Sequence, residues 1–451
     1  MKFPIPLLAA LLLPLLSLSA QQPSGEMLKN WNQWRGPLEN GVAPESQPVV
    51  EWSESQNIKW KTAIPGIGHA TPIIWENQII LLSAVPTDKA GPTKEASDAG
   101  EGNGEDTSWM NATTTDRVHQ FTVISVDRPT GEILWKTVVR EAVPYSGTHE
   151  FGSWASNSPI TDGERIYAYF GSMGLYCLDL SGKVLWERDF GRMEKRMDFG
   201  DGSSPTLYKD KVIVVRDHEG PSSIHVLNKF SGETIWEKER DEISAWSTPR
   251  VVEYNGSAQL ITAASNKARS YNPENGDLIW ECSGLTGNVI PCPLYEDGRV
   301  YLMSGFRGTA SMAIDLSKAR GDITNSDAIV WRYNVNTSYT PSPVLLDGRL
   351  YFLRSNNGFL TCLNAADGSI NYEAVNLEGV STIFTSPLGA GGNLYVVGTK
   401  GTSCVVKLGP TYELLSTNTL DDSFYASPVA LGKELYLKGD HFLYCIAEGG
   451  E

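Results

Sequence analysis

The sequence predicts an all-β protein: an eight-bladed β-propeller of four-stranded blades, closed into a ring by strands from both ends of the chain. Two repeats that run in phase predict the blades. One is a proline that follows Ser, Thr or Cys, and the other is a strand that ends in Trp. The closure follows from a third observation, because the start of the chain supplies a strand that its end lacks.

The proline repeat marks the first strand of each blade. Between Pro159 and Pro428, successive repeat prolines are 41–50 residues apart. Each is followed by a short polar stretch and then an apolar strand, as in "SPITDGERIYAYFG". A period of this length, with several short strands in each unit, is typical of propeller blades. The repeat prolines are Pro72, Pro159, Pro205, Pro249, Pro293, Pro343, Pro387 and Pro428.

The tryptophan repeat marks the last strand of each blade. It consists of a strand ending in Asp or Asn, a turn with Gly, and a strand ending in Trp, as in "VISVDRPTGEILW". The glycine permits a tight turn and leaves a bare peptide on which a neighbouring indole can lie. We therefore assign these tryptophans to the framework and not to a binding site. The aromatic positions are Trp135, Trp186, Trp236, Trp280, Trp331 and Tyr372, with Leu415 last.

The two ends of the chain are expected to share one blade. Trp60 lies before the first repeat proline, and the strand expected over 442–447 has no Trp strand after it. Pairing these two strands completes the last blade and leaves no sheet edge open at the junction.

The pattern divides the chain into segments. Residues 1–20 combine a lysine with a short apolar run that ends in small residues, as in a secretory signal peptide. Residues 21–50 form an N-terminal lead-in, and residues 51–451 form the propeller. Residues 86–118 are acidic, rich in Gly and poor in apolar residues, so we expect a flexible insertion. We expect an exported protein, periplasmic or extracellular, without a transmembrane segment.

Charge and cysteine positions narrow the chemistry. A net charge of −16 argues against nucleic acid as a partner, because the two would repel. Four of the six cysteines share one repeat position with small residues of other blades, and we expect them to be free and buried. Cys282 and Cys292 flank one connection between blades, and their pairing stays open. The four at the repeat position are Cys177, Cys362, Cys404 and Cys445.

The loops at one end of the ring are the expected ligand site. The connections that enter each first strand open on the same end as the loops between second and third strands. Among the residues three before each repeat proline, His69, Trp246, Phe384 and Tyr425 are candidate ligand-binding residues. Aromatic faces suit sugar rings or flat ligands, although packing of the channel is an alternative explanation.

The loops between second and third strands carry cations in five successive blades. Such an arc on an acidic protein indicates attraction of an anionic ligand, such as a uronate or a sulfated or phosphorylated group. The alternative is solvated loop charge offset by acids such as Asp440. The five cations are Lys267, Arg307, Arg354, Lys400 and Lys438.

No catalytic or metal-binding constellation is evident. Histidines beside acidic residues are sparse, as at His149-Glu150, and no spacing motif indicates that three or four such groups converge on a metal. The chain has no recognisable Ser-His-Asp order, Gly-rich phosphate loop or thiolate site.

The repeat "SVDRPTGEILW" resembles the tryptophan-docking motif A-x-D-x-x-T-G-x-x-x-W of eight-bladed quinoprotein propellers, with Ser in place of the first Ala. The lead-in "WNQWRGPLENGVAPE" is similar to that of secreted PQQ-binding-like repeat proteins, a family related to the scaffold lipoprotein of the outer-membrane assembly machine. The resemblance covers about residues 30–450 and implies the fold, with PQQ as a candidate cofactor. The chain departs from quinoprotein alcohol dehydrogenases, because it has neither their adjacent Cys pair nor a matching acidic calcium set.

We therefore expect an exported, monomeric propeller that acts as a binding or scaffold module. Its partner would be an anionic small molecule or polysaccharide held at the channel mouth. Two alternatives stay open: a PQQ-dependent periplasmic dehydrogenase, which the resemblance implies, and a protein-binding platform within an envelope assembly complex. The lack of a catalytic constellation favours binding over catalysis.

Overall fold

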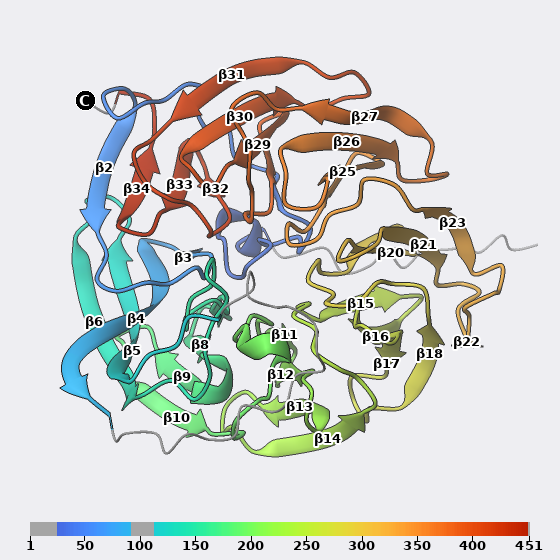
Figure 1. The fold of residues 1–451 in the computed structure, drawn as a ribbon, viewed down its shortest axis with the longest axis horizontal. Helices are drawn as coiled ribbons and strands as arrows, with labels where there is room; N and C mark the ends of the chain where they lie inside the picture. The colour runs from blue at the N-terminus through green and yellow to red at the C-terminus, as the bar shows by residue number, and fades with distance from the viewer. Residues whose placement is uncertain (1–24, 92–111, 450–451) are drawn as a thin grey trace, which may run out of the picture.

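Eight β-sheets surround a central axis in the computed structural model, which describes residues 25–91 and 112–449 (Figure 1). The expected signal peptide lies outside the described residues. We number the sheets as blades 1–8 from the first repeat proline. In each blade the strand that follows the proline lies nearest the axis, and the Trp-type strand lies at the rim (Figure 1). The all-β, eight-bladed fold is therefore confirmed.

Four antiparallel strands make up the body of every blade. Blades 1–4 contain, from the axis outward, β3 (Ile73–Trp75), β4 (Gln78–Ala90), β5 (Arg117–Asp127) and β6 (Ile133–Ala142); β7 (Ile160–Thr161), β8 (Arg165–Tyr169), β9 (Leu175–Asp179) and β10 (Val184–Arg188); β11 (Thr206–Tyr208), β12 (Lys211–Arg216), β13 (Ser222–Asn228) and β14 (Thr234–Arg240); and β15 (Arg250–Tyr254), β16 (Ser257–Thr262), β17 (Ala268–Tyr271) and β18 (Leu278–Cys282).

The second half of the ring repeats this order. Blades 5–8 contain β19 (Leu294–Glu296), β20 (Arg299–Ser304), β21 (Ala310–Asp315) and β23 (Ile329–Tyr333); β24 (Val344–Leu346), β25 (Arg349–Leu353), β26 (Phe359–Asn364) and β27 (Ile370–Asn376); β28 (Leu388–Ala390), β29 (Asn393–Val397), β30 (Thr402–Lys407) and β31 (Leu414–Thr419); and β32 (Val429–Leu431), β33 (Glu434–Lys438), β34 (Phe442–Ile446) and β2 (Ile58–Ala63).

The remaining described elements are short. They are the strands β1 (Val42–Ala43) and β22 (Gly321–Asp322), and 3₁₀ turns at Met27–Lys29, Gly171–Met173 and Arg196–Asp198. Among the described residues, no helix has the length and apolar character needed to cross a membrane.

Blade 8 joins the two ends of the chain, as the sequence predicts. Strand β2 pairs antiparallel with β34 and places Trp60 opposite Cys445. The chain that leads into blade 1 is thereby held in blade 8 by main-chain hydrogen bonds, which covers the edge that β34 would otherwise expose.

Five tryptophans lock five of the blades to the next one in the ring. Each indole lies on the glycine of the following blade's turn so closely that a Cβ there would come within 3.0 Å of the ring. Each Nε1–H also donates to a backbone carbonyl of the same turn, at 2.9–3.2 Å. The glycines have φ of +72° to +86°, a region that other residues rarely adopt. The pairs are Trp60 on Gly131, Trp135 on Gly182, Trp186 on Gly232, Trp236 on Gly276 and Trp331 on Gly368.

Trp280 departs from this pattern. The turn that should receive it is replaced by a longer segment between β21 and β23, whose strand β22 pairs with β18 and sets Gly321 beside Trp280. The indole is fully buried, and its Nε1–H donates to Gln259 of its own blade at 3.0 Å. Trp280 is still structural, but it packs under an insertion and not on a glycine.

The cysteines are core residues. All six are free and buried, so Cys282 and Cys292 do not pair. Three of the four at the repeat position lie opposite the docking position of the neighbouring strand: Cys177 opposite Trp186, Cys362 opposite Tyr372 and Cys445 opposite Trp60. A small side chain is needed there because the aromatic residue occupies the adjacent space. Cys404 lies one residue out of this register, opposite Thr417, so its predicted place in the repeat is wrong although it is buried.

A ring of hydrogen bonds around the axis explains why Ser or Thr precedes the repeat proline. In one blade after another, the backbone N–H of this residue donates to the side-chain oxygen of the same position in the next blade, at 2.8–3.1 Å. Cys292 in blade 5 lacks a hydroxyl, so the bond from Thr248 to the next blade is missing. The members of this hydroxyl ring are Thr71, Ser158, Ser204, Thr248, Ser342, Ser386 and Ser427.

The lead-in closes one end of the axial channel. In Figure 1 the blue N-terminal segment lies near the centre of the ring. It makes main-chain or side-chain hydrogen bonds to blades 1, 2, 4, 6, 7 and 8, and β1 adds a parallel strand to β28 of blade 7. Trp31 is fully buried against this end of the sheets. The channel is therefore open at one end only.

The expected insertion over 86–118 is partly strand. Strand β4 continues to Ala90 and β5 begins at Arg117, and the two pair beyond the limits of the other blades' hairpins. Alternating side chains on these extensions are buried or half-buried, for example His119 and Phe121, which explains their order. Residues 92–111 lie outside the described part of the chain.

Replacing Trp186 by Ala is expected to lower the free energy of unfolding by about 3–5 kcal/mol, because the lost indole leaves a cavity behind. Urea denaturation followed by circular dichroism measures this. The adjacent Leu185 is exposed on the rim, and its replacement by Ala should change stability by less than about 0.5 kcal/mol. Equal effects of the two substitutions would contradict the docking role.

Replacing Ser386 by Ala should cost about 1–3 kcal/mol, because the buried N–H of Ser342 loses its acceptor. Ser386→Thr keeps the hydroxyl, as Thr71 does at the same position, and should retain nearly all of the stability. Thermal unfolding of the two variants tests the hydroxyl ring. A Thr variant as unstable as the Ala variant would show that the hydroxyl is not what matters.

Candidate functional site

The open end of the channel contains a cavity of about 580 Å³. Its wall includes the residue three before each repeat proline, from all eight blades, as the strand directions imply. These residues are His69, Ser156, Gly202, Trp246, Ile290, Thr340, Phe384 and Tyr425. Four of the predicted site residues, His69, Trp246, Phe384 and Tyr425, thus lie around one space.

The deep end of the cavity combines hydroxyl groups with one indole. Five members of the hydroxyl ring line it, and Trp34 of the lead-in lies beside them. Each of these oxygens accepts a backbone N–H from the preceding blade, which leaves its own O–H proton to donate. This end therefore offers hydrogen-bond donors to a ligand. The five residues are Thr71, Ser158, Ser204, Ser386 and Ser427.

One wall is a continuous aromatic surface. Phe151 lies with its ring centroid 5.2 Å from that of Phe384, which lies 5.7 Å from Tyr425. His69 stacks on Tyr425 at 4.3 Å. Phe151 is 39% exposed although it projects from an otherwise packed connection, so an apolar face is left available at the cavity.

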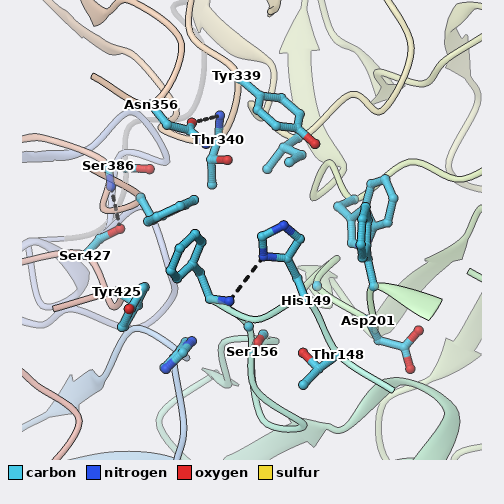
Figure 2. Close-up of a pocket in the computed structure, with 18 of the residues that line it drawn as sticks. Thr148, His149, Ser156, Asp201, Tyr339, Thr340, Asn356, Ser386, Tyr425 and Ser427 are labelled. Atoms are coloured by element: carbon cyan, nitrogen blue, oxygen red, sulfur yellow. Dashed lines mark hydrogen bonds between the residues drawn. The ribbon is translucent and has the colours of Figure 1, made fainter. Parts of the chain in front are cut away.

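His149 projects into the middle of the cavity (Figure 2). Its Nδ1 accepts the N–H of Phe151 at 3.1 Å, and this bond assigns the proton of the neutral ring to Nε2. Partial burial lowers the pKa of His149, so the ring is neutral at pH 7. His149 therefore presents an N–H donor toward a ligand.

His69 is held by Asp440. Its Nε2 lies 3.1 Å from Oδ1 of Asp440, and its Nδ1 is buried without a hydrogen-bond partner. Burial lowers the pKa of His69, and the carboxylate of Asp440 opposes this shift only in part. The imidazole of His69 is therefore chiefly neutral, and its ring supports Tyr425 by stacking on it.

The charges at the cavity are few. Arg307 is the one Lys or Arg among the residues that line it, and it lies exposed over the ring of Phe306. Two carboxylates, Glu150 and Asp201, line the same space. Asp201 accepts the N–H of Ser172 at 2.8 Å through Oδ2, while its Oδ1 has no partner.

The other four cations of the expected arc lie away from the cavity. Lys267 forms an ion pair with Glu281 at 2.5 Å, and Arg354 lies over the ring of Phe359. Lys400 is exposed, whereas Lys438 is buried and donates to the carbonyl of Gly439. Of the five cations only Arg307 lines the cavity, so equivalent positions in the repeat do not bring these cations together.

Several residues of the cavity were not predicted from the repeat. His149 and Phe151 come from the connection between blades 1 and 2, and Phe199 and Asp201 come from the next connection. Both connections are longer than the others, since Trp135 and Pro159 are farther apart than Trp236 and Pro249. The extra residues of these two connections line the channel mouth. The longer spacing from Trp to Pro is the feature of the sequence that indicates them.

A hydrogen-bonded series of catalytic residue types occurs elsewhere. Ser223 lies 2.9 Å from His225, whose other nitrogen lies 3.4 Å from Glu237. These residues sit on β13 and β14, and none of them lines the axial cavity. Burial lowers the pKa of His225 to about 4, and Ser223 is itself buried, so a substrate has no approach to it. We assign the series to the packing of blade 3.

Comparison with known proteins identifies the family. A family model described as "Outer membrane protein assembly factor BamB", a propeller of PQQ-like repeats, matches residues 119–370 and 318–409. The chain belongs to this BamB family. No curated protein sequence matches it.

Solved structures agree with the fold. BamB from Moraxella catarrhalis is 15% identical, with a TM-score of 0.51, and the match covers 82% of this chain and 99% of that one. The quinohemoprotein alcohol dehydrogenase from Comamonas testosteroni is 10% identical, with a TM-score of 0.60, over 94% and 81% of the two chains. At these identities the likeness establishes the propeller fold of this BamB-family chain and nothing about its ligand.

The buried charge of Lys438 gives a test of stability. Burial lowers its pKa to about 8, whereas an unfolded lysine titrates near 10.4. Below pH 8 the native state holds a poorly solvated charge, so Lys438→Met should raise the free energy of unfolding at pH 7 by about 1–3 kcal/mol.

The gain should shrink as the pH rises from about 8 to 10.4, since the native wild-type lysine is then already neutral. Denaturation at several pH values checks this. A gain that does not depend on pH would contradict the buried-charge explanation.

Proposed function

We propose that this protein is an exported binding module that holds a saccharide in its axial cavity. The observation that carries the proposal is a one-ended cavity with aromatic walls and a deep end of hydroxyl donors. Sugar rings present apolar C–H faces to aromatic side chains and many oxygen acceptors to O–H and N–H donors. The cavity offers both kinds of partner.

Arg307 supports an acidic group on that saccharide. It is exposed at the cavity and close enough to donate to a carboxylate that reaches the mouth. One arginine, opposed by Glu150 and Asp201, suits a single uronate and not a densely charged polymer. We therefore still propose an anionic carbohydrate as the ligand, as expected from the sequence. Arg307 and the aromatic wall would recognise it, in place of the arc of five cations.

Binding to neutral and uronate-containing oligosaccharides, measured by isothermal titration calorimetry, tests the proposal. Phe384→Ala should weaken binding about 2- to 10-fold through loss of a stacking face. Arg307→Ala should weaken only the acidic ligands, and added salt should reduce that difference.

Arg354→Ala is the matched control for Arg307. It removes an exposed cation of the same loop set that does not line the cavity, so affinity should not change. If neither Phe384→Ala nor Arg307→Ala changes the affinity, or if Arg354→Ala lowers it equally, the cavity is not the binding site.

PQQ is the cofactor that the family and the quinohemoprotein neighbour make possible. PQQ carries several carboxylates and binds with a divalent cation in the dehydrogenases. Here the cavity offers one arginine and two carboxylates, and the described residues contain no group of three His, Cys, Asp or Glu able to hold a metal ion. The residues present do not fit this group, and we derive no chemistry through it.

A platform for partner proteins is the second candidate, and the family match favours it. Such a role would use the outer surface and the loops, and it is compatible with an occupied cavity. Cross-linking in an envelope extract, with the Phe384→Ala variant as a control for cavity binding, separates the two roles. A partner captured equally by both forms supports the platform.

A further inference from the structure

A second, much smaller cavity lies on the closed side of the ring. It measures about 20 Å³, enough for one water molecule or one monoatomic ion. The lead-in forms one side with Trp34, Arg35 and Glu39, and the starts of the inner strands of blades 2–5 form the other. It is separate from the proposed saccharide site, although Trp34 and Ser204 border both.

Arg35 is a buried cation without a counter-charge. It is 5% exposed, and its terminal nitrogens donate to the backbone carbonyls of Pro343, Pro387 and, at 3.5 Å, Asn40. Its Nε–H is buried with no partner, and it takes part in no ion pair among the described residues. Burial lowers the pKa of Arg35 to about 10, which still leaves it charged at neutral pH. A lone buried guanidinium is strongly unfavourable.

Arg250 brings a second cation to the same cavity. It is 9% exposed, and its terminal nitrogens donate to the backbone carbonyls of Leu38 and Glu39. Its Nε lies 3.4 Å from the Glu39 carboxylate but makes no hydrogen bond. Glu39 is the only acidic residue that lines the cavity, so two cations face one anion. The lining carries a net positive charge.

The gap in the hydroxyl ring opens onto this cavity. Thr248 and Cys292, the two residues between which the ring is interrupted, both line it. Thr248 accepts the N–H of Ser204 through Oγ1, so its O–H proton is free to donate. With no hydroxyl at position 292, the N–H of Thr248 also lacks the acceptor that the other blades supply. The cavity thus gathers donors and positive charge.

We propose that this cavity binds a single halide ion, chloride under ordinary conditions. The ion would accept hydrogen bonds from Arg35, Arg250 and Thr248 and neutralise the excess charge. It would also tie the lead-in to blades 4 and 5, where the hydroxyl ring is broken. The inference is independent of the saccharide proposal and concerns the closed end of the channel.

Thermal unfolding in matched salts tests the proposal. The full protein is dialysed into sodium gluconate and then titrated with sodium chloride or bromide at constant ionic strength. The Tm should rise with the logarithm of the halide concentration above its Kd, because a ligand bound only to the native state stabilises it. Gluconate cannot enter a space of this size.

Arg250→Gln should abolish the halide dependence while Arg349→Gln, an arginine of blade 6 outside the cavity, should keep it. If Arg250→Gln does not fold, a crystal of the wild-type protein grown in bromide decides the question. An anomalous peak between Arg35 and Arg250 is expected. Equal Tm in gluconate and halide, or crystals without that peak, would overturn the proposal and leave water as the occupant.

Discussion

The hydroxyl ring around the axis is the interaction on which the rest of the structure depends. A propeller blade cannot cover both of its faces alone, so its position must be fixed by its neighbours. Docked tryptophans fix the outer part at five of the eight junctions between blades, and the hydroxyl ring fixes the inner part at seven of them, at 2.8–3.1 Å per link. Because these links sit one residue before each proline, they also set the place of the residues two positions earlier, which form the cavity wall.

The lead-in gives this symmetric ring two different ends. Repetition alone would produce a channel with similar openings, but residues from Trp31 to Val50 cross one opening and bond to six blades. Trp34 then becomes part of the cavity and not of the surface. The cavity therefore owes its individual shape to the segments that break the repeat: the lead-in and the two long connections that carry His149 and Phe199.

The sequence predicts the repeated parts of the molecule well and the unrepeated parts poorly. The blade number, the closure through Trp60 and the place of Tyr425 at the cavity follow from spacing, because equivalent positions in a repeat have equivalent surroundings. The arc of cations fails to gather for the same reason that Trp280 departs from its neighbours: loop length varies between blades, and a loop position does not fix where a long side chain ends. His149 had no repeat partner to mark it.

The course of the lead-in also has a consequence in time. The segment that closes the channel is made before the blades it contacts, and its partners include Pro387 and Gly432 of the last two blades. Contacts of such large sequence separation form late in folding. A chain still being synthesised can dock this segment on its early blades, but the contacts with blades 6–8 form only when those blades exist. The ring therefore closes only when blade 8 is present to pair with β2.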